Sequence, residues 1–239
     1  MHLMKIKPFI LLFISIVLFS FINISNSNEI ASIKETNSKD KSANKLLKDV
    51  SKKYKDFKSL KSEFTMVNEP ADDKAKKTTE KGSLSSKGNS FKLVFGGQEI
   101  FCNGKYIWTY TEENKECVKD NYNPNSGKVI NPSKIFSIWE KGFLYASDGS
   151  YKKGSATIAK IKLTPTDKSV PYFLMNLEVD QNAKTLQNLK ISFKAGNKQT
   201  YTITSQTPNT IISNSYFEFD KTKYKDVELI DLSSKKTKK

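Results

Sequence analysis

Residues 82–111 read GSLSSKGNSFKLVFGGQEIFCNGKYIWTYT, and in much of this segment apolar residues recur at every second position. Phe91, Leu93 and Phe95 show this alternation, which is typical of a β-strand with one buried face. Glycine-containing turns interrupt it at residues 87–89, 96–97 and 103–104. Short strands joined by tight turns pair antiparallel with their neighbours. The segment therefore predicts an antiparallel meander.

Two other segments follow the period of a helix, about 3.6 residues. The first is expected to begin with Ser42 as its N-cap. Its apolar residues are Leu46, Leu47, Val50, Tyr54 and Phe57. The second is expected to begin with Asn131 as N-cap and Pro132 in the first helical position. Its apolar residues are Ile135, Phe136, Ile138, Trp139 and Phe143.

Strand-like alternation also occurs around Phe64 and Met66 and in the last third of the chain. The later segments are residues 156–163, 172–180, 185–193, 199–205 and 216–219. This order of elements predicts an α+β domain with roughly nine to eleven antiparallel strands. A sheet of that size must curl, so we expect an incomplete, open β-barrel whose hydrophobic cavity is capped by the helices.

The N-terminus has the features of a secretory signal. Lys5 and Lys7 precede an apolar run over residues 9–22, and small residues before Asn28 suit a cleavage site. An uncleaved N-terminal anchor is the alternative interpretation. We expect an exported, soluble protein with this organisation: a signal peptide (1–27), a flexible leader (28–42), a single domain (43–232) and a disordered lysine-rich tail (233–239).

The formal net charge is +15, and every basic residue is a lysine. Proteins that read nucleic acids rely heavily on arginine, whose guanidinium forks match guanine and phosphate. The lysines are also spread along the whole chain. We therefore expect a solvated basic surface and no nucleic-acid partner, with weak attraction to anionic lipid headgroups as a secondary effect.

The sequence offers little catalytic chemistry. The only histidine, His2, lies in the predicted signal peptide, which argues against Ser-His-Asp catalysis and against metal sites that use imidazole. The adjacent acids Glu112 and Glu113 lie in a predicted turn, where two carboxylates do not converge on a substrate. We expect no enzyme, no metal and no cofactor. A hydrolase that uses carboxylates alone remains a less favoured alternative.

Cys102 and Cys117 are the only cysteines. They fall on strands that are predicted to pair about a turn near Glu113, and this pairing places Cys117 opposite Trp108 or Thr109. The two thiols would then be roughly 20 Å apart along the strands, beyond the reach of a disulfide. We expect two free, partly buried thiols.

Large apolar side chains on the predicted inner face and second helix are the candidate binding residues. An open barrel of this size can hold an apolar ligand, although an ordinary packed core is the alternative. The candidates are Phe64, Leu84, Phe91, Leu93, Phe95, Tyr106, Trp108, Tyr110, Ile135, Phe136 and Trp139.

Residues 43–219 resemble the LolA family of periplasmic carriers for outer-membrane lipoproteins. The segments that carry the resemblance are residues 54–64, Gly82-Ser83-Leu84 followed by Phe91, and NGKYIWTY at 103–110. Residues 123–126 and 131–136 are similar to a divergent branch found in Bacteroidota-type envelopes. The resemblance implies a periplasmic, non-catalytic carrier whose cavity, lined by Phe91, takes the acyl chains of lipoproteins. The oligomeric state is open, and a monomer is the default expectation. An ATP-driven exporter in the inner membrane would supply this cargo, and an outer-membrane receptor or the membrane itself would accept it.

One position departs from the family. Its classical branch has an arginine shortly before the cavity-lining phenylalanine, and that arginine is important in transfer. Here the region reads Lys87-Gly88-Asn89-Ser90, so Lys87 is the candidate handover charge, without the fork geometry of arginine. A module that senses envelope lipid or lipoprotein on the same half-barrel is the alternative function.

Overall fold

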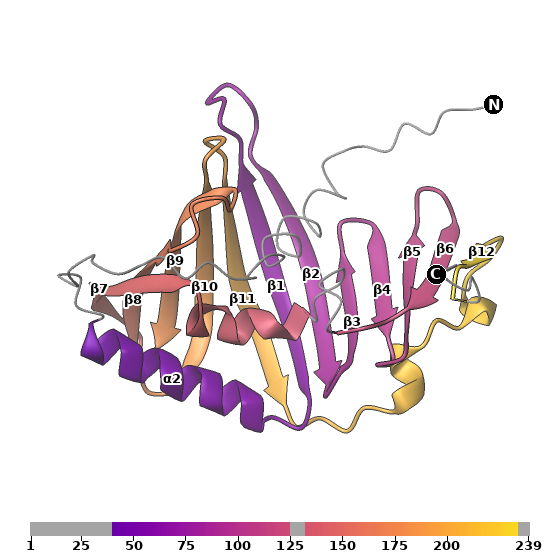
Figure 1. Ribbon diagram of the computed structural model, residues 1–239, viewed down its shortest axis with the longest axis horizontal. Helices are drawn as coiled ribbons and strands as arrows, with labels where there is room; N and C mark the ends of the chain where they lie inside the picture. Colours follow the sequence, from indigo (N-terminus) through magenta and orange to yellow (C-terminus); the bar gives the residue numbers. More distant parts are fainter. Residues whose placement is uncertain (1–39, 125–131, 234–239) are drawn as a thin grey trace, which may run out of the picture.

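The computed structural model describes residues 40–124 and 132–233. The predicted signal peptide, most of the predicted leader and Asn131 lie outside these residues. A single twelve-stranded sheet forms the body of the molecule (Figure 1), in the order β12-β6-β5-β4-β3-β2-β1-β11-β10-β9-β8-β7. The strands are β1 (Leu60–Glu69), β2 (Thr78–Lys87), β3 (Ser90–Phe95), β4 (Gln98–Cys102), β5 (Tyr106–Thr111), β6 (Glu116–Asn121), β7 (Phe143–Lys153), β8 (Ala156–Pro165), β9 (Tyr172–Asp180), β10 (Thr185–Phe193), β11 (Lys198–Pro208) and β12 (Glu228–Asp231).

The sheet is open, because its edge strands β7 and β12 lie at opposite ends of the order. All neighbours pair antiparallel except β12, which runs parallel to β6. The predicted α+β class and the open antiparallel half-barrel are confirmed. The predicted strand count is slightly low, since β7 is a mostly exposed edge strand without alternation and β12 has only four residues.

Helix α2 (Lys41–Asp56) lies across one face of the sheet (Figure 1). Its N-cap is Asp40 rather than the predicted Ser42: the Asp40 carboxylate accepts hydrogen bonds from the Ser42 and Ala43 amides, at 2.9 and 3.3 Å. The helix therefore starts inside the segment predicted to be a flexible leader. Ala43, Leu47 and Val50 are buried against the sheet, as the helical period requires.

The second predicted helix forms as the 3-10 helix η1 (Pro132–Glu140), not as an α-helix. In a 3-10 helix, residues three positions apart point in the same direction. Phe136 and Trp139 are spaced in this way, and both are buried, with 3% and 2% of their surface exposed. The 3-10 period thus aims two large aromatic side chains at the sheet together.

We call the side of the sheet covered by α2 and η1 the inner face and the opposite side the outer face.

The C-terminal segment (residues 209–231) includes the short 3-10 helices η2 (Asn214–Phe217) and η3 (Lys221–Lys223) before β12. The sequence predicts a strand at residues 216–219; the structure has η2 there and extended chain after it. No helix among residues 40–124 and 132–233 has the length and hydrophobicity needed to cross a membrane.

The two cysteines lie in separate parts of the interior. Cys102 pairs with Ile107, and Cys117 pairs with Tyr110 rather than with Trp108 or Thr109. Cys102 belongs to the core below the helices, whereas Cys117 belongs to a smaller cluster on the outer face. Both thiols are free, as predicted, and they are more completely buried than expected.

Candidate functional site

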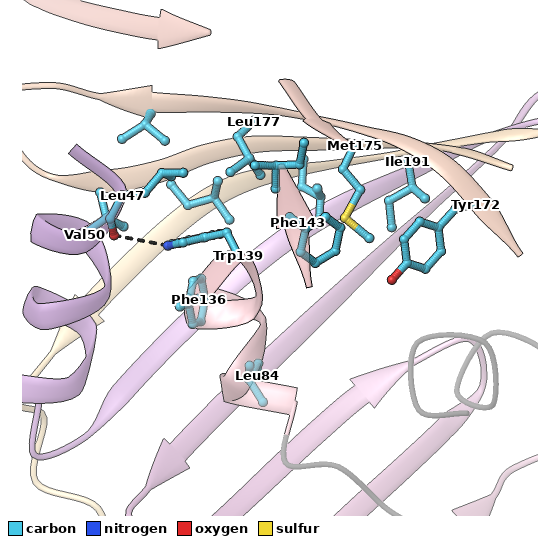
Figure 2. Close-up of a cluster of buried hydrophobic side chains, with 14 of the residues drawn as sticks. Leu47, Val50, Leu84, Phe136, Trp139, Phe143, Tyr172, Met175, Leu177 and Ile191 are labelled. Atoms are coloured by element: carbon cyan, nitrogen blue, oxygen red, sulfur yellow. Dashed lines mark hydrogen bonds between the residues drawn. The ribbon is translucent and has the colours of Figure 1, made fainter. Parts of the chain in front are cut away.

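The inner face is a continuous apolar surface that extends across most of the sheet. Its strand residues are aliphatic or aromatic, apart from one cysteine, and come from both halves of the sheet. They are Leu60, Leu84, Phe91, Ile100, Cys102, Ile107, Ile161, Leu163, Tyr172, Met175, Leu177, Val179, Leu186, Leu189, Ile191 and Phe193. Figure 2 shows part of this surface, with the side chains of α2 and η1 packed onto it.

Helices α2 and η1 form a cover over the inner face and are joined to each other by specific contacts. The indole Nε1–H of Trp139 donates to the Leu47 carbonyl at 3.1 Å and to the Ser51 hydroxyl at 2.8 Å. The rings of Tyr54 and Phe136 stack with their centroids 4.2 Å apart. These contacts fix the position of η1 on α2, while its aromatic side chains reach the sheet.

The chain leaves η1 through Gly142 before β7 begins. Gly142 has a φ of +79°, a conformation that glycine adopts without the steric cost that a side chain would bring. A 3-10 helix of nine residues is long for its kind, and its hydrogen-bond geometry is poorer than that of an α-helix. The connection from η1 to β7 thus depends on a glycine at residue 142.

A buried polar network lies beneath the C-terminal end of α2. The Tyr54 hydroxyl accepts from the Leu186 amide at 3.1 Å and donates to the Gln206 Oε1 at 2.8 Å. Burial raises the pKa of Tyr54 to about 12. The hydroxyl therefore stays protonated and orients the Gln206 amide.

Six of the predicted binding residues come together as expected. Leu84, Phe91 and Leu93 lie on the inner face of β2 and β3, and Ile135, Phe136 and Trp139 of η1 pack against the same core. Phe64 and Phe95 contact each other further along, with ring centroids 5.6 Å apart.

The structure corrects the placement of Tyr106, Trp108 and Tyr110. Residues alternate between faces along β5, and Ile107 faces inward. The three aromatic residues lie on the outer face, in a cluster with Phe101 and Cys117. The C-terminal segment covers this cluster through its own apolar side chains, Phe219, Tyr224 and Val227. Tyr106, Trp108 and Tyr110 are therefore part of a packed outer layer and do not line the inner face.

Lys87 is engaged in a structural contact at the end of β2. Its Nζ donates to the Ile212 carbonyl and to the Asn214 Oδ1, both at 3.0 Å. The ammonium group thus holds the start of the C-terminal segment. A handover role for Lys87 stays a prediction.

Sequence reasoning missed the half of the inner face that β8, β9 and β10 supply. Its members include Ile161, Leu163, Met175, Leu177 and Ile191, each at most 2% exposed. The sequence did indicate strands here, because apolar and polar residues alternate clearly in these segments. What was missing was the knowledge that β10 joins β1 through β11, which extends one face across both halves.

The described residues contain no group of three or more His, Cys, Asp or Glu side chains placed to hold a metal ion. The inner face offers apolar contact area, a small polar network and a cover of two helices.

Comparison with known proteins places this fold among solved structures. No protein-family model and no curated protein sequence matches the chain. An uncharacterized conserved protein from Thermus thermophilus is similar over 80% of this chain and 99% of that chain, with a TM-score of 0.51 and 11% identity. A LolA superfamily protein from Nitrosomonas europaea is similar over 74% of this chain and 97% of that chain, with a TM-score of 0.38 and 12% identity. LprF from Mycobacterium bovis is similar over 72% of this chain and 95% of that chain, with a TM-score of 0.45 and 14% identity. At these identities the similarity concerns the fold alone.

Proposed function

We propose that this protein is a periplasmic carrier that binds the acyl chains of lipoproteins on the inner face of its sheet, after η1 has moved aside. The observation that carries the proposal is the combination of a broad apolar face with a 3-10 helix, η1, that lies over it and is held to α2 by one indole N–H and one aromatic stack. In this structure, side chains of α2 and η1 occupy the inner face, so the form described is the closed one. Binding requires exchange of η1 side chains for ligand.

The free energies make this exchange feasible. Opening the cover loses the hydrogen bonds of one indole N–H, one aromatic stack and the burial of Phe136 and Trp139. Each methylene of an acyl chain contributes about 0.8 kcal/mol on burial. About ten buried methylenes therefore offset the contacts of η1, which is fewer than one common acyl chain contains.

The same numbers limit how much lipid a carrier should bury. Complete burial of two or three acyl chains would exceed the affinity that non-covalent complexes reach. A carrier that must release its cargo therefore needs an unfavourable step that offsets part of the free energy of acyl-chain burial. Displacement of η1 is one such step. By the resemblance to the LolA family, an ATP-driven exporter would load the protein, and an outer-membrane receptor or the membrane would receive the cargo.

The two tryptophans provide a direct test, because they lie on opposite faces of the sheet. In a Trp108→Phe variant, Trp139 on η1 is the only tryptophan, so acyl-chain binding should shift its fluorescence emission towards that of a solvent-exposed indole. In the matched Trp139→Phe variant, Trp108 in the outer cluster should report little change. Failure of the wild-type protein to take up a fluorescent fatty-acyl probe at micromolar concentration would contradict the proposal.

Transport and sensing differ in what happens after binding. In an assay with two populations of vesicles, a carrier accelerates transfer of an acylated protein from donor to acceptor vesicles. A sensing module on the same face binds the acyl chains but leaves the transfer rate unchanged. Acceleration is the outcome that we expect.

A further inference from the structure

The inner face contains two buried polar atoms that have no hydrogen-bond partner among the described residues: the Ser62 Oγ and the Gln206 Nε2. These residues lie directly opposite each other where β1 pairs with β11. Side chains of such a pair point to the same face and stand about 5 Å apart at Cβ. Ser62 is only 3% exposed. Native proteins rarely leave groups of this kind unpaired, because desolvation without a partner is costly.

The geometry of the neighbouring network determines what the pair can bind. Since Tyr54 donates to the Gln206 Oε1, the amide carbonyl of Gln206 is engaged and its NH₂ group is left to donate. The Ser62 hydroxyl can also donate. The pair therefore forms a site for a hydrogen-bond acceptor, set into an apolar surface.

The surroundings show which kind of acceptor fits. On the other side of β1, Ser62 pairs with Leu84, which belongs to the apolar core of the inner face. A charged acceptor such as a phosphate would lose its hydration there without meeting a buried cation, and this is strongly unfavourable. A neutral carbonyl oxygen can accept hydrogen bonds from the pair without bringing a charge into the apolar core. The hydrocarbon chain joined to it matches the apolar surroundings.

The Ser62–Gln206 pair is also linked to η1 through Tyr54. Phe136 of η1 stacks on Tyr54, and Tyr54 binds Gln206. Movement of η1 therefore exposes the ring of Tyr54, the residue that binds Gln206. A ligand that replaces the η1 side chains comes to lie beside the two donors.

We propose that Ser62 and Gln206 bind the carbonyl oxygen that links an acyl chain to its carrier molecule, as an ester or an amide. This inference rests on the proposed function and adds a chemical preference to it: the inner face distinguishes acylated molecules from plain hydrocarbon or ether lipids. The two donors also fix where along the sheet each acyl chain begins.

The test compares two ligands with equal chain lengths, a diacylglycerol and its dialkyl ether analogue, as competitors of a fluorescent fatty-acyl probe. The wild-type protein should prefer the ester by about three- to tenfold, as one or two hydrogen bonds provide. Ser62→Ala should lose most of this preference while its affinity for the ether is unchanged. It should fold normally, because no hydrogen bond of the described structure is removed.

Ser192→Ala is the matched control, since Ser192 is also a buried serine, 6% exposed, but follows the inner-face residue Ile191 and so points to the outer face. Its ester preference should equal that of the wild type. As a second readout, the infrared carbonyl band of an isotope-labelled ester should move to lower frequency on binding, and less so in Ser62→Ala. Equal competition by ester and ether, or an unchanged preference in Ser62→Ala, would overturn this site and leave the carrier proposal standing. Binding of neither ligand would instead refute the carrier proposal itself.

Discussion

Gly82 illustrates how a single residue shapes the inner face. A Cβ at this position would clash with the ring of Phe64 and would approach the ring of Phe95 within 2.9 Å. Gly82 pairs with Phe64 across β1 and β2, so the ring occupies the space that a side chain at residue 82 would fill. The absence of a side chain at residue 82 is thus what allows Phe64 and Phe95 to meet.

We expect Gly82→Ala to lower the free energy of unfolding by about 1–3 kcal/mol, as overpacking does in other cores. Urea denaturation measures this change. Phe64→Leu should make room for the new methyl group, so the double variant should lose less stability than the sum of the two single changes. Strict additivity would contradict the contact.

At this scale the sequence predicted which residues are large and apolar, but not always which face they occupy. On β5, Ile107 and the aromatic residues on either side of it are all apolar, so alternation alone could not tell inside from outside. The answer depended on the C-terminal segment, whose Phe219 and Tyr224 cover the aromatic side. Both faces of β5 are buried, each by a different part of the chain.

Among the elements, η1 is the one on whose stability the proposed function depends. Its position depends on the indole of Trp139, and the Ser51 hydroxyl is one of the two groups that accept from it. A change that weakens this bond lowers the cost of opening the cover and leaves the inner face intact.

Ser51→Ala should therefore reduce stability by about 1 kcal/mol and yet bind an acyl probe more tightly than the wild type, because the open form becomes more populated. Probe titration and thermal unfolding measure the two effects. Ser59→Ala is the control: it removes the hydrogen bond from the Ser59 hydroxyl to the Thr210 carbonyl, away from η1. It should lower stability without increasing affinity. Weaker binding in Ser51→Ala would show that η1 does not act as a cover.

The existence of both helices on the inner face followed from their apolar spacing, whereas the 3-10 form of η1 did not. Apolar residues at positions 135, 136, 138 and 139 satisfy an α-helical stripe and a period of three equally well. Contact with Tyr54 and Leu47 settled the question, because it requires Phe136 and Trp139 to point in one direction. Such a choice between two helical forms depends on packing partners that lie 80 or more residues away.

At the scale of the whole molecule, the interior is rich in buried groups that lose a proton at high pH. Burial raises the pKa of the Cys102 thiol to about 11 and that of Cys117 to about 12, from an ordinary 9.0. Burial also raises the pKa of Tyr122 and Tyr172 to about 12, from 10.0. In the unfolded chain these groups would release their protons at lower pH than in the folded protein.

The sign of the pH dependence follows from linkage. Below pH 9 both states hold these protons, and their contribution to stability is fully present. As the pH rises from 9 towards 12, the unfolded state is increasingly favoured. We expect the urea midpoint to be level between pH 7 and 8.5 and to fall steadily above pH 9. In a Cys102→Ala/Cys117→Ala variant, the urea midpoint should fall less between pH 9 and 10 than in the wild type. An equal fall would show that the tyrosines alone cause the loss of stability.

The open sheet with helices on one face could be predicted from periodicity, because each strand and helix has a clear period. The total of twelve strands could not. β7 is largely exposed and β12 is very short, so neither carries the alternation that a buried strand shows. Their assignment depends on backbone pairing with β8 and β6, which leaves no trace in apolar spacing.

The parallel pairing of β12 with β6 has a consequence for how the chain reaches its native state. β6 is completed at Asn121, but its partner strand spans Glu228–Asp231, more than a hundred residues later. Until residues 219–231 have packed, the β6 edge of the sheet and the aromatic side of β5 stand uncovered, and such surfaces invite association between chains. A chain that stopped just after β11 would keep the strands of the inner face but would leave β6 as a free edge and the aromatic side of β5 uncovered, so we expect it to aggregate more readily than the full chain.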